Sequence, residues 1–162
     1  MRNTMKLSVA MVLVLAACGG EKKPEADTGA AAPTVVATAD VGAEKYAQVC
    51  AVCHQATGLG VEGNFPPLAG SDWVTGKSEV PIAIVLHGLQ GEIEVLGKKY
   101  NNAMAPWGEA LNDAEIAAVL TYARSQWGNT AAAVTADEVK AARAKYASRT
   151  TPWTVAELTP MR

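Results

Sequence analysis

The feature that most constrains this chain is the run Cys50-Ala51-Val52-Cys53-His54. On a helix, positions i and i+3 lie on one side, so the two thiols can face the same way. The histidine follows at once, and its imidazole can turn toward whatever the thiols hold. This spacing is that of covalent haem attachment through two thioether bonds. The run therefore predicts one haem c, bound through Cys50 and Cys53, with His54 as an axial ligand of its iron.

Two other uses of these thiols fit the sequence less well. A redox-active dithiol of the thioredoxin kind requires a βαβ setting, but Cys50 ends a predicted helix in a chain with almost no strand signal. A zinc site needs two further ligands. The chain has two histidines, His54 and His87, and they lack the usual paired spacing. A disulfide framework is excluded because the chain has three cysteines.

A second iron ligand can be sought among the five methionines, which are Met1, Met5, Met11, Met104 and Met161. The first three lie in a predicted signal peptide, and Met161 is the penultimate residue. Met104 lies in a loop just before the best-marked helix, from which a thioether can arch over the free face of a haem. Histidine–methionine ligation raises the reduction potential, since the soft thioether favours ferrous iron. The alternative is a methionine that only fills a gap in the core.

The N-terminal segment predicts export and a lipid anchor. Two basic residues precede an apolar run, residues 7–17, which has the length of a signal-peptide core and is too short to span a bilayer. The run ends in Leu15-Ala16-Ala17-Cys18, which resembles the lipobox of bacterial lipoproteins. That resemblance implies that residues 1–17 are removed and that Cys18 carries lipid on the periplasmic side of a bacterial membrane. Ordinary cleavage is the alternative, but it prefers a small residue where the leucine stands.

Composition separates the remaining chain into a linker, a domain and a tail. Residues 18–39, which begin with Cys18, are rich in Gly, Ala, Pro and Thr and show no apolar period. This composition indicates a flexible linker with a reach of roughly 25 Å. A globular domain is expected over residues 40–128, and a C-terminal helix and tail over residues 129–162. The chain has 14 Lys and Arg against 16 Asp and Glu, and the signal segment holds two of the basic residues. The mature protein is therefore mildly acidic, and nothing indicates a nucleic-acid partner.

Helical periodicity is strongest over residues 113–127. Asn112 and Glu115 have the spacing of a capping box at its start. The apolar stripe that follows consists of Ile116, Val119, Leu120, Ala123 and Trp127. A second capping pair, Thr135 and Glu138, predicts a further amphipathic helix.

The other expected elements are less strongly marked. A first helix is predicted from Asp40 as N-cap to Cys50, and a short one between Ser78 and Gly88. The segment from Ile93 to Gly97 suggests a small extended turn rather than a sheet. The second amphipathic helix is expected over residues 136–148, with an irregular end over residues 149–162.

From about residue 40 to residue 128 the chain resembles class I cytochromes c. The matching features are the C-x-x-C-H run on the first helix, a proline-containing loop, a methionine loop and a final helix with an aromatic residue. The resemblance implies an all-α class I cytochrome c fold around one covalent haem, with a C-terminal helical extension. It also implies that a proline carbonyl accepts a hydrogen bond from His54. In the matching run Pro66-Pro67-Leu68, Pro66 is the favoured acceptor and Pro67 the alternative.

In the same family the first and last helices cross closely through a small residue and an aromatic one. The matching residues here are Gly42 and Tyr46 on the first helix, and Val119 and Tyr122 on the last.

Two longer runs, residues 65–73 and 121–128, resemble a narrower group of cytochromes. These accompany, or are fused to, periplasmic copper nitrite reductases and quinoprotein dehydrogenases. With both axial positions filled by His54 and Met104, we expect an electron-transfer protein rather than an enzyme, which exchanges single electrons with periplasmic or membrane redox partners. The alternatives are a fixed cytochrome subunit of an oxidoreductase or respiratory complex, and an enzyme or gas sensor in which Met104 leaves the iron.

Three further residues have alternative interpretations. His87, at the end of a predicted helix, is expected to cap the last helical carbonyls, with an iron or propionate contact as the alternative. Trp73 and Trp107 either line the haem pocket or pack in the core.

Overall fold

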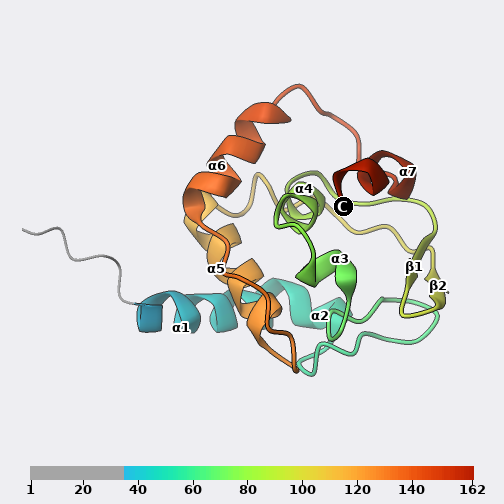
Figure 1. Ribbon diagram of the computed structural model, residues 1–162, viewed down its shortest axis with the longest axis horizontal. Coiled ribbons are helices and arrows are strands. Elements are labelled where there is room, and N and C mark those ends of the chain that lie inside the picture. Colours follow the sequence, from blue (N-terminus) through green and yellow to red (C-terminus); the bar gives the residue numbers. More distant parts are fainter. Residues whose placement is uncertain (1–34) are drawn as a thin grey trace, which may run out of the picture. The chain divides into compact units, whose positions relative to one another are not determined.

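The computed structural model describes residues 35–162, and Figure 1 shows their arrangement. The predicted signal peptide, the lipidated Cys18 and most of the linker lie outside the described residues. The elements are α1 (Val35–Lys45), the π-helical turn η1 (Tyr46–Cys50), α2 (Ala51–His54), α3 (Asp72–Thr75), α4 (Glu79–His87), β1 (Ile93–Val95), β2 (Lys98–Tyr100), α5 (Asp113–Ser125), α6 (Ala136–Lys145), α7 (Val155–Leu158) and the 3-10 turn η2 (Thr159–Met161). No helix among these residues is both long enough and apolar enough to cross a bilayer.

The first helical run carries the C-x-x-C-H motif on its last turns. It starts at Val35 and continues through η1 and α2 to His54, so the predicted limits, Asp40 and Cys50, were wrong at both ends. Residues 35–39 can be helical because no glycine or proline lies between Pro33 and Gly42. The run ends at Gln55, whose φ of 61° turns the chain away from the helix axis.

Helices α1 and α5 cross at a glycine. A Cβ on Gly42 would overlap the carbonyl oxygen of Ala118, so the two backbones approach as closely as glycine allows. Beside the crossing, the Tyr46 and Tyr122 rings lie 5.4 Å apart. The expected crossing is thus formed, with Ala118 rather than Val119 against the glycine.

The two predicted capping boxes are confirmed. The Asn112 side chain accepts a hydrogen bond from the backbone N–H of Glu115, and the Thr135 side chain accepts one from that of Glu138. Each glutamate side chain accepts a hydrogen bond from the backbone N–H of its N-cap residue in return. Helix α5 ends at Ser125, two residues earlier than predicted. Trp127 therefore lies outside it, with a φ of 54°.

The segment predicted as an extended turn is a two-stranded hairpin. Strands β1 and β2 pair antiparallel in the register Ile93↔Tyr100, Glu94↔Lys99 and Val95↔Lys98. The two residues between the strands, Leu96 and Gly97, both have positive φ, as a tight hairpin turn of the primed type requires. Leucine is an unusual residue for that position, so the sequence pattern missed the hairpin.

The tail returns to the core instead of ending irregularly. Helix α6 stops at Lys145 rather than residue 148, and the chain then passes to α7, which lies near α4 and the hairpin (Figure 1). Leu158 of α7 is fully buried, and Trp153 before it is 6% exposed. Both pack in one core with Ile93, Val95 and Tyr100 of the hairpin. The prediction of an irregular segment over residues 149–162 was therefore wrong.

Candidate haem site

An apolar pocket lies between the C-x-x-C-H turn, α4, α5 and the hairpin. Its empty space amounts to about 830 Å³ when the open mouth and adjoining solvent are counted. Its apolar wall includes Leu68, Val74, Ile84, Val85, Ile93, Val95, Leu120 and Ala123. Cys50, His54 and Met104 line the same pocket. A flat apolar ring with a metal at its centre fits this combination of wall and ligand side chains.

The two thiols of the motif are free and half-buried. Burial, with a smaller contribution from Cys53, raises the pKa of Cys50 to about 11. A thiol that exchanges disulfides needs a lowered pKa instead, because the thiolate is the reactive form. The electrostatics therefore do not suit a redox dithiol, whereas both sulfurs remain available for thioether bonds.

One hydrogen bond fixes the proton of His54. Its Nδ1 lies 2.9 Å from the carbonyl oxygen of Pro66, and a carbonyl can only accept, so Nδ1 carries the proton. Burial lowers the pKa of His54, although the hydrogen bond to Pro66 opposes this shift. The neutral ring keeps a free lone pair on Nε2, the form in which histidine ligates a metal. Pro66, and not Pro67, is the acceptor.

Behind the histidine, the chain reversal at Gln55 is held by Tyr46. The Tyr46 hydroxyl donates to the Gln55 carbonyl over 2.6 Å, and the ring itself lines the pocket. The sequence had placed Tyr46 only at the helix crossing. A hydrogen bond to a backbone carbonyl nine residues away leaves no pattern in the sequence.

Met104 reaches the pocket from a loop that is pinned to the end of α4. Its N–H donates to the Leu89 carbonyl over 2.9 Å, and the Leu89 N–H donates back over 3.1 Å. Met161 lies in the tail instead, where its sulfur is 4.0 Å from the Tyr146 hydroxyl. Of the two methionines outside the predicted signal peptide, only Met104 lines the pocket with His54.

Of the three remaining candidates, the two tryptophans line the pocket and the histidine does not. Trp73 and Trp107 both line the pocket, and the Trp73 indole N–H donates to the Glu94 carbonyl over 3.0 Å. His87 is not among the lining residues, and its buried Nε2 has no hydrogen-bond partner, so this nitrogen does not cap the helix as predicted. Within residues 35–162, no three His, Cys, Asp or Glu side chains gather as a metal site.

Comparison with known proteins identifies the family. Residues 37–122 match the family described as cytochrome C oxidase, cbb3-type, subunit III. The chain belongs to this cytochrome c family. It is 47% identical over 113 residues to a cytochrome c-552 of Thermus thermophilus, a match that covers 64% of this chain and 85% of the relative.

Two further relatives are cytochrome subunits of dehydrogenases. The cytochrome c subunit of a quinone alcohol dehydrogenase from Gluconacetobacter polyoxogenes is 36% identical over 101 residues, which cover 60% of this chain and 21% of the relative. The cytochrome subunit of fructose dehydrogenase from Gluconobacter japonicus is 35% identical over 119 residues, 68% of this chain and 23% of the relative. The chain thus spans about a fifth of these longer proteins.

Membership of the family confirms three predictions. The mostly helical structure is a cytochrome c domain of the expected class. The cofactor is a covalently bound haem c, for which Cys50 and Cys53 are positioned. The protein carries electrons and is not itself a catalytic enzyme.

Proposed function

We propose that this cytochrome holds a single haem between His54 and Met104 and is tethered by a lipid on Cys18 to the periplasmic side of a bacterial membrane. The observation that carries the proposed ligation is that both side chains line one apolar pocket together with Cys50. With two protein ligands on the iron, no position is open to a substrate. The function is then to receive and deliver single electrons between redox proteins in the periplasm or membrane, with no nucleic-acid partner.

The haem, when bound, supplies a one-electron iron couple. The chain's own residues tune it: Pro66 fixes the ring of His54, Met104 offers a soft ligand, and the apolar wall excludes water. The soft methionine and the apolar wall favour the reduced iron and so raise the potential, while Pro66 keeps the His54 ring in one orientation. Val52, between the two thiols, is 74% exposed. This supports an attached haem edge near the surface, where a small and transient partner interface suffices.

Replacing the methionine tests the ligand assignment. The oxidised wild-type protein is expected to show the far-red charge-transfer band of methionine-ligated haem, and its reduced form not to bind carbon monoxide at neutral pH. Met104→Ala should abolish the band and permit carbon monoxide binding. Met161→Ala is the matched control and should behave as wild type. A wild-type protein without the band, or a Met104→Ala protein that keeps it, would overturn the assignment.

The membrane tether is supported by the lipobox-like run that ends at Cys18 and by the linker composition of residues 18–39. A linker with a reach of roughly 25 Å would let the domain turn on its anchor to meet different partners. The proposed location on the periplasmic side also suits a covalently held cofactor, since an exported protein cannot recapture a lost one.

A fixed subunit of a periplasmic oxidoreductase is the second candidate. It is favoured by the relatives whose names describe cytochrome subunits of alcohol and fructose dehydrogenases. Gel filtration of a mild detergent extract separates the two candidates. A shuttle elutes alone, whereas a subunit co-elutes with a dehydrogenase activity.

A further inference from the structure

The segment Gly88–Gln90 lies between the methionine loop and the C-terminal tail. On one edge, Leu89 and Met104 exchange two backbone hydrogen bonds of 3.1 and 2.9 Å. On the other edge, the Trp153 N–H donates to the Gly88 carbonyl over 3.0 Å, and the Gln90 N–H donates to the Trp153 carbonyl over 2.8 Å. Met104 and Trp153 are therefore paired to opposite sides of the same three residues.

The side chain of Trp153 is firmly held. It is 6% exposed, and the Arg149 guanidinium carbon lies 3.6 Å from the centre of its ring. The Tyr146 ring meets it edge-on, with the ring centres 5.0 Å apart. A guanidinium over an indole face is held there by a favourable cation–π interaction.

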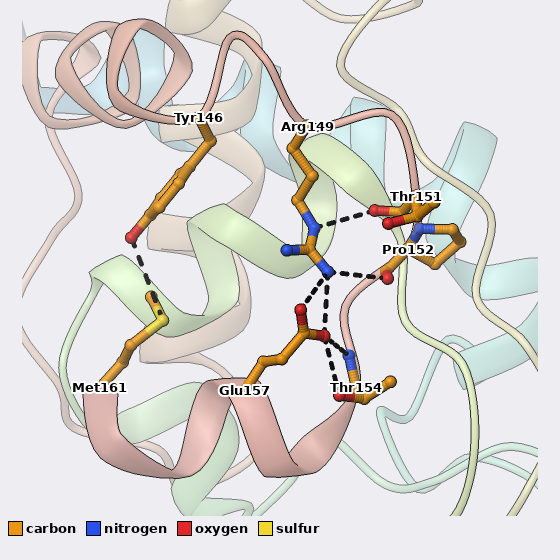
Figure 2. Close-up of polar contacts among 7 residues, drawn as sticks. All are labelled: Tyr146, Arg149, Thr151, Pro152, Thr154, Glu157 and Met161. Carbon is orange, nitrogen blue, oxygen red and sulfur yellow. Dashed lines mark hydrogen bonds and ion pairs between the residues drawn. The ribbon is translucent and has the colours of Figure 1, made fainter.

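The same guanidinium also bonds to residues that precede and follow Trp153 in the chain. Arg149 donates to the carbonyls of Thr151 and Pro152, each over 2.9 Å, and to both carboxylate oxygens of Glu157, also over 2.9 Å (Figure 2). Glu157 in turn accepts from the Thr154 N–H over 2.8 Å. Because these contacts precede and follow Trp153 in the chain, they fix the backbone that pairs with Gly88 and Gln90.

Gly88, which the tail holds, packs tightly against Met104. Gly88 has a φ of 80°, and a Cβ built on it would lie 2.5 Å from the Met104 carbonyl oxygen. A shift of Gly88–Gln90 therefore displaces Met104 instead of being absorbed in a void.

We propose that Trp153, fixed by Arg149, is a positioning residue for Met104. The tail holds Gly88–Gln90 in place, and that segment sets where the methionine thioether lies and how readily it leaves the iron. This inference rests on the proposed assignment of Met104 as the second iron ligand. It gives residues 129–162, which follow the part of the chain matched to the family, a role in the redox site.

The test uses the full-length, haem-loaded protein with Arg149→Ala. As the pH is raised, the variant should lose the far-red band about one pH unit earlier than the wild-type protein. The affinity of its reduced form for carbon monoxide should be about tenfold higher. Amide hydrogen exchange at Met104 should rise by a similar factor. Arg149→Lys keeps a charge near the ring but loses the planar fork, and an intermediate effect is expected. The single substitution Trp153→Phe keeps the backbone pairing and an aromatic face for Arg149, and this variant should retain most of the wild-type behaviour.

Arg162→Ala is the matched control. The Arg162 guanidinium carbon lies 4.1 Å from the centre of the Trp73 ring, and its side chain pairs with Asp72. The control thus removes another arginine–tryptophan contact of the tail, but none at Gly88–Gln90. It should lower the melting temperature by a comparable amount while leaving the band, carbon monoxide binding and Met104 exchange unchanged.

Equal changes in the two variants, or no change in either, would refute the positioning role and leave the tail as a stabilising element only. Failure of the ligand assignment looks different, because the wild-type protein itself then lacks the far-red band. In that case the exchange rate of the Met104 amide still decides whether the tail holds this segment.

Discussion

At His54, one backbone carbonyl decides which ring nitrogen can meet a metal. The His54 Nδ1–H donates a hydrogen bond to the Pro66 carbonyl over 2.9 Å, and burial favours the neutral ring by lowering its pKa. At Met104 the control is steric as well as polar, since Gly88 leaves no room for a side-chain carbon beside the Met104 carbonyl. Both ligand candidates could be found from residue type and motif spacing. The groups that orient them could not, because a contact to a distant backbone atom leaves no periodic signal.

Gly88→Ala should destabilise the protein more than Gly91→Ala. Both glycines have positive φ, 80° and 83°, but a Cβ at Gly91 would meet nothing within 4 Å. Each substitution should cost about 1–3 kcal/mol for the positive-φ backbone, and Gly88→Ala about 1–3 kcal/mol more for the overlap. Denaturant unfolding of both variants measures the difference. Equal losses would show that the contact with Met104 is not tight.

His87 should make the protein less stable in acid. Burial, and then the charges of Arg149 and Arg143, lower the pKa of His87 below its ordinary 6.5. The unfolded chain therefore takes up the proton first, so the free energy of unfolding falls as the pH drops below about 6.5. His87→Gln should flatten this part of the pH profile. Parallel profiles for the two proteins would contradict the prediction.

Among the elements, those with strong local signals were predicted and those made by distant contacts were missed. Helices α5 and α6 carry capping boxes and were found, although each ends earlier than expected. The hairpin was missed because its turn residues are Leu96 and Gly97. Helix α7 was missed because four residues show too little periodicity, and its place depends on the burial of Leu158.

The Asn112 cap should contribute measurably to the stability of α5. Asn112→Ala removes the acceptor of the Glu115 N–H, a bond of 3.0 Å, and should lower the free energy of unfolding by about 1 kcal/mol. Asn101→Ala, at an exposed position in a loop, is the control and should change it by less than about 0.5 kcal/mol. Thermal melts of the two variants would show the contrast, and equal melting temperatures would rule out a capping role.

For the whole molecule, the family and the cofactor followed from one five-residue run, while the course of the tail did not. The run Cys50–His54 limits the chemistry to very few choices. The path of residues 146–162 depends instead on where Trp153, Leu158 and Arg162 find partners across the core, and this is decided by tertiary packing. Residue type alone fits a tail that makes no contact with the domain equally well.

The proposed tether makes a prediction about location. Cys18→Ser should remove the site of lipidation, so the cytochrome should move from the membrane fraction to the soluble periplasmic fraction. Its haem spectrum should not change, because the substitution lies far from the haem motif in sequence. Cell fractionation followed by haem staining measures both. A membrane-bound Cys18→Ser protein would contradict the lipid anchor.

The pairing of Trp153 with Gly88–Gln90 also bears on the order in which the cytochrome matures. A chain made from its N-terminus presents Cys50, Cys53 and His54 long before Trp153 exists. Until residue 153 is present, the segment Gly88–Gln90 is paired on one edge only, by Met104. The cofactor can thus be joined to its cysteines while the opposite face is still loosely held. On the proposed ligation, a chain truncated before Trp153 is therefore expected to keep its covalent haem but to lose much of the far-red band of its methionine ligand.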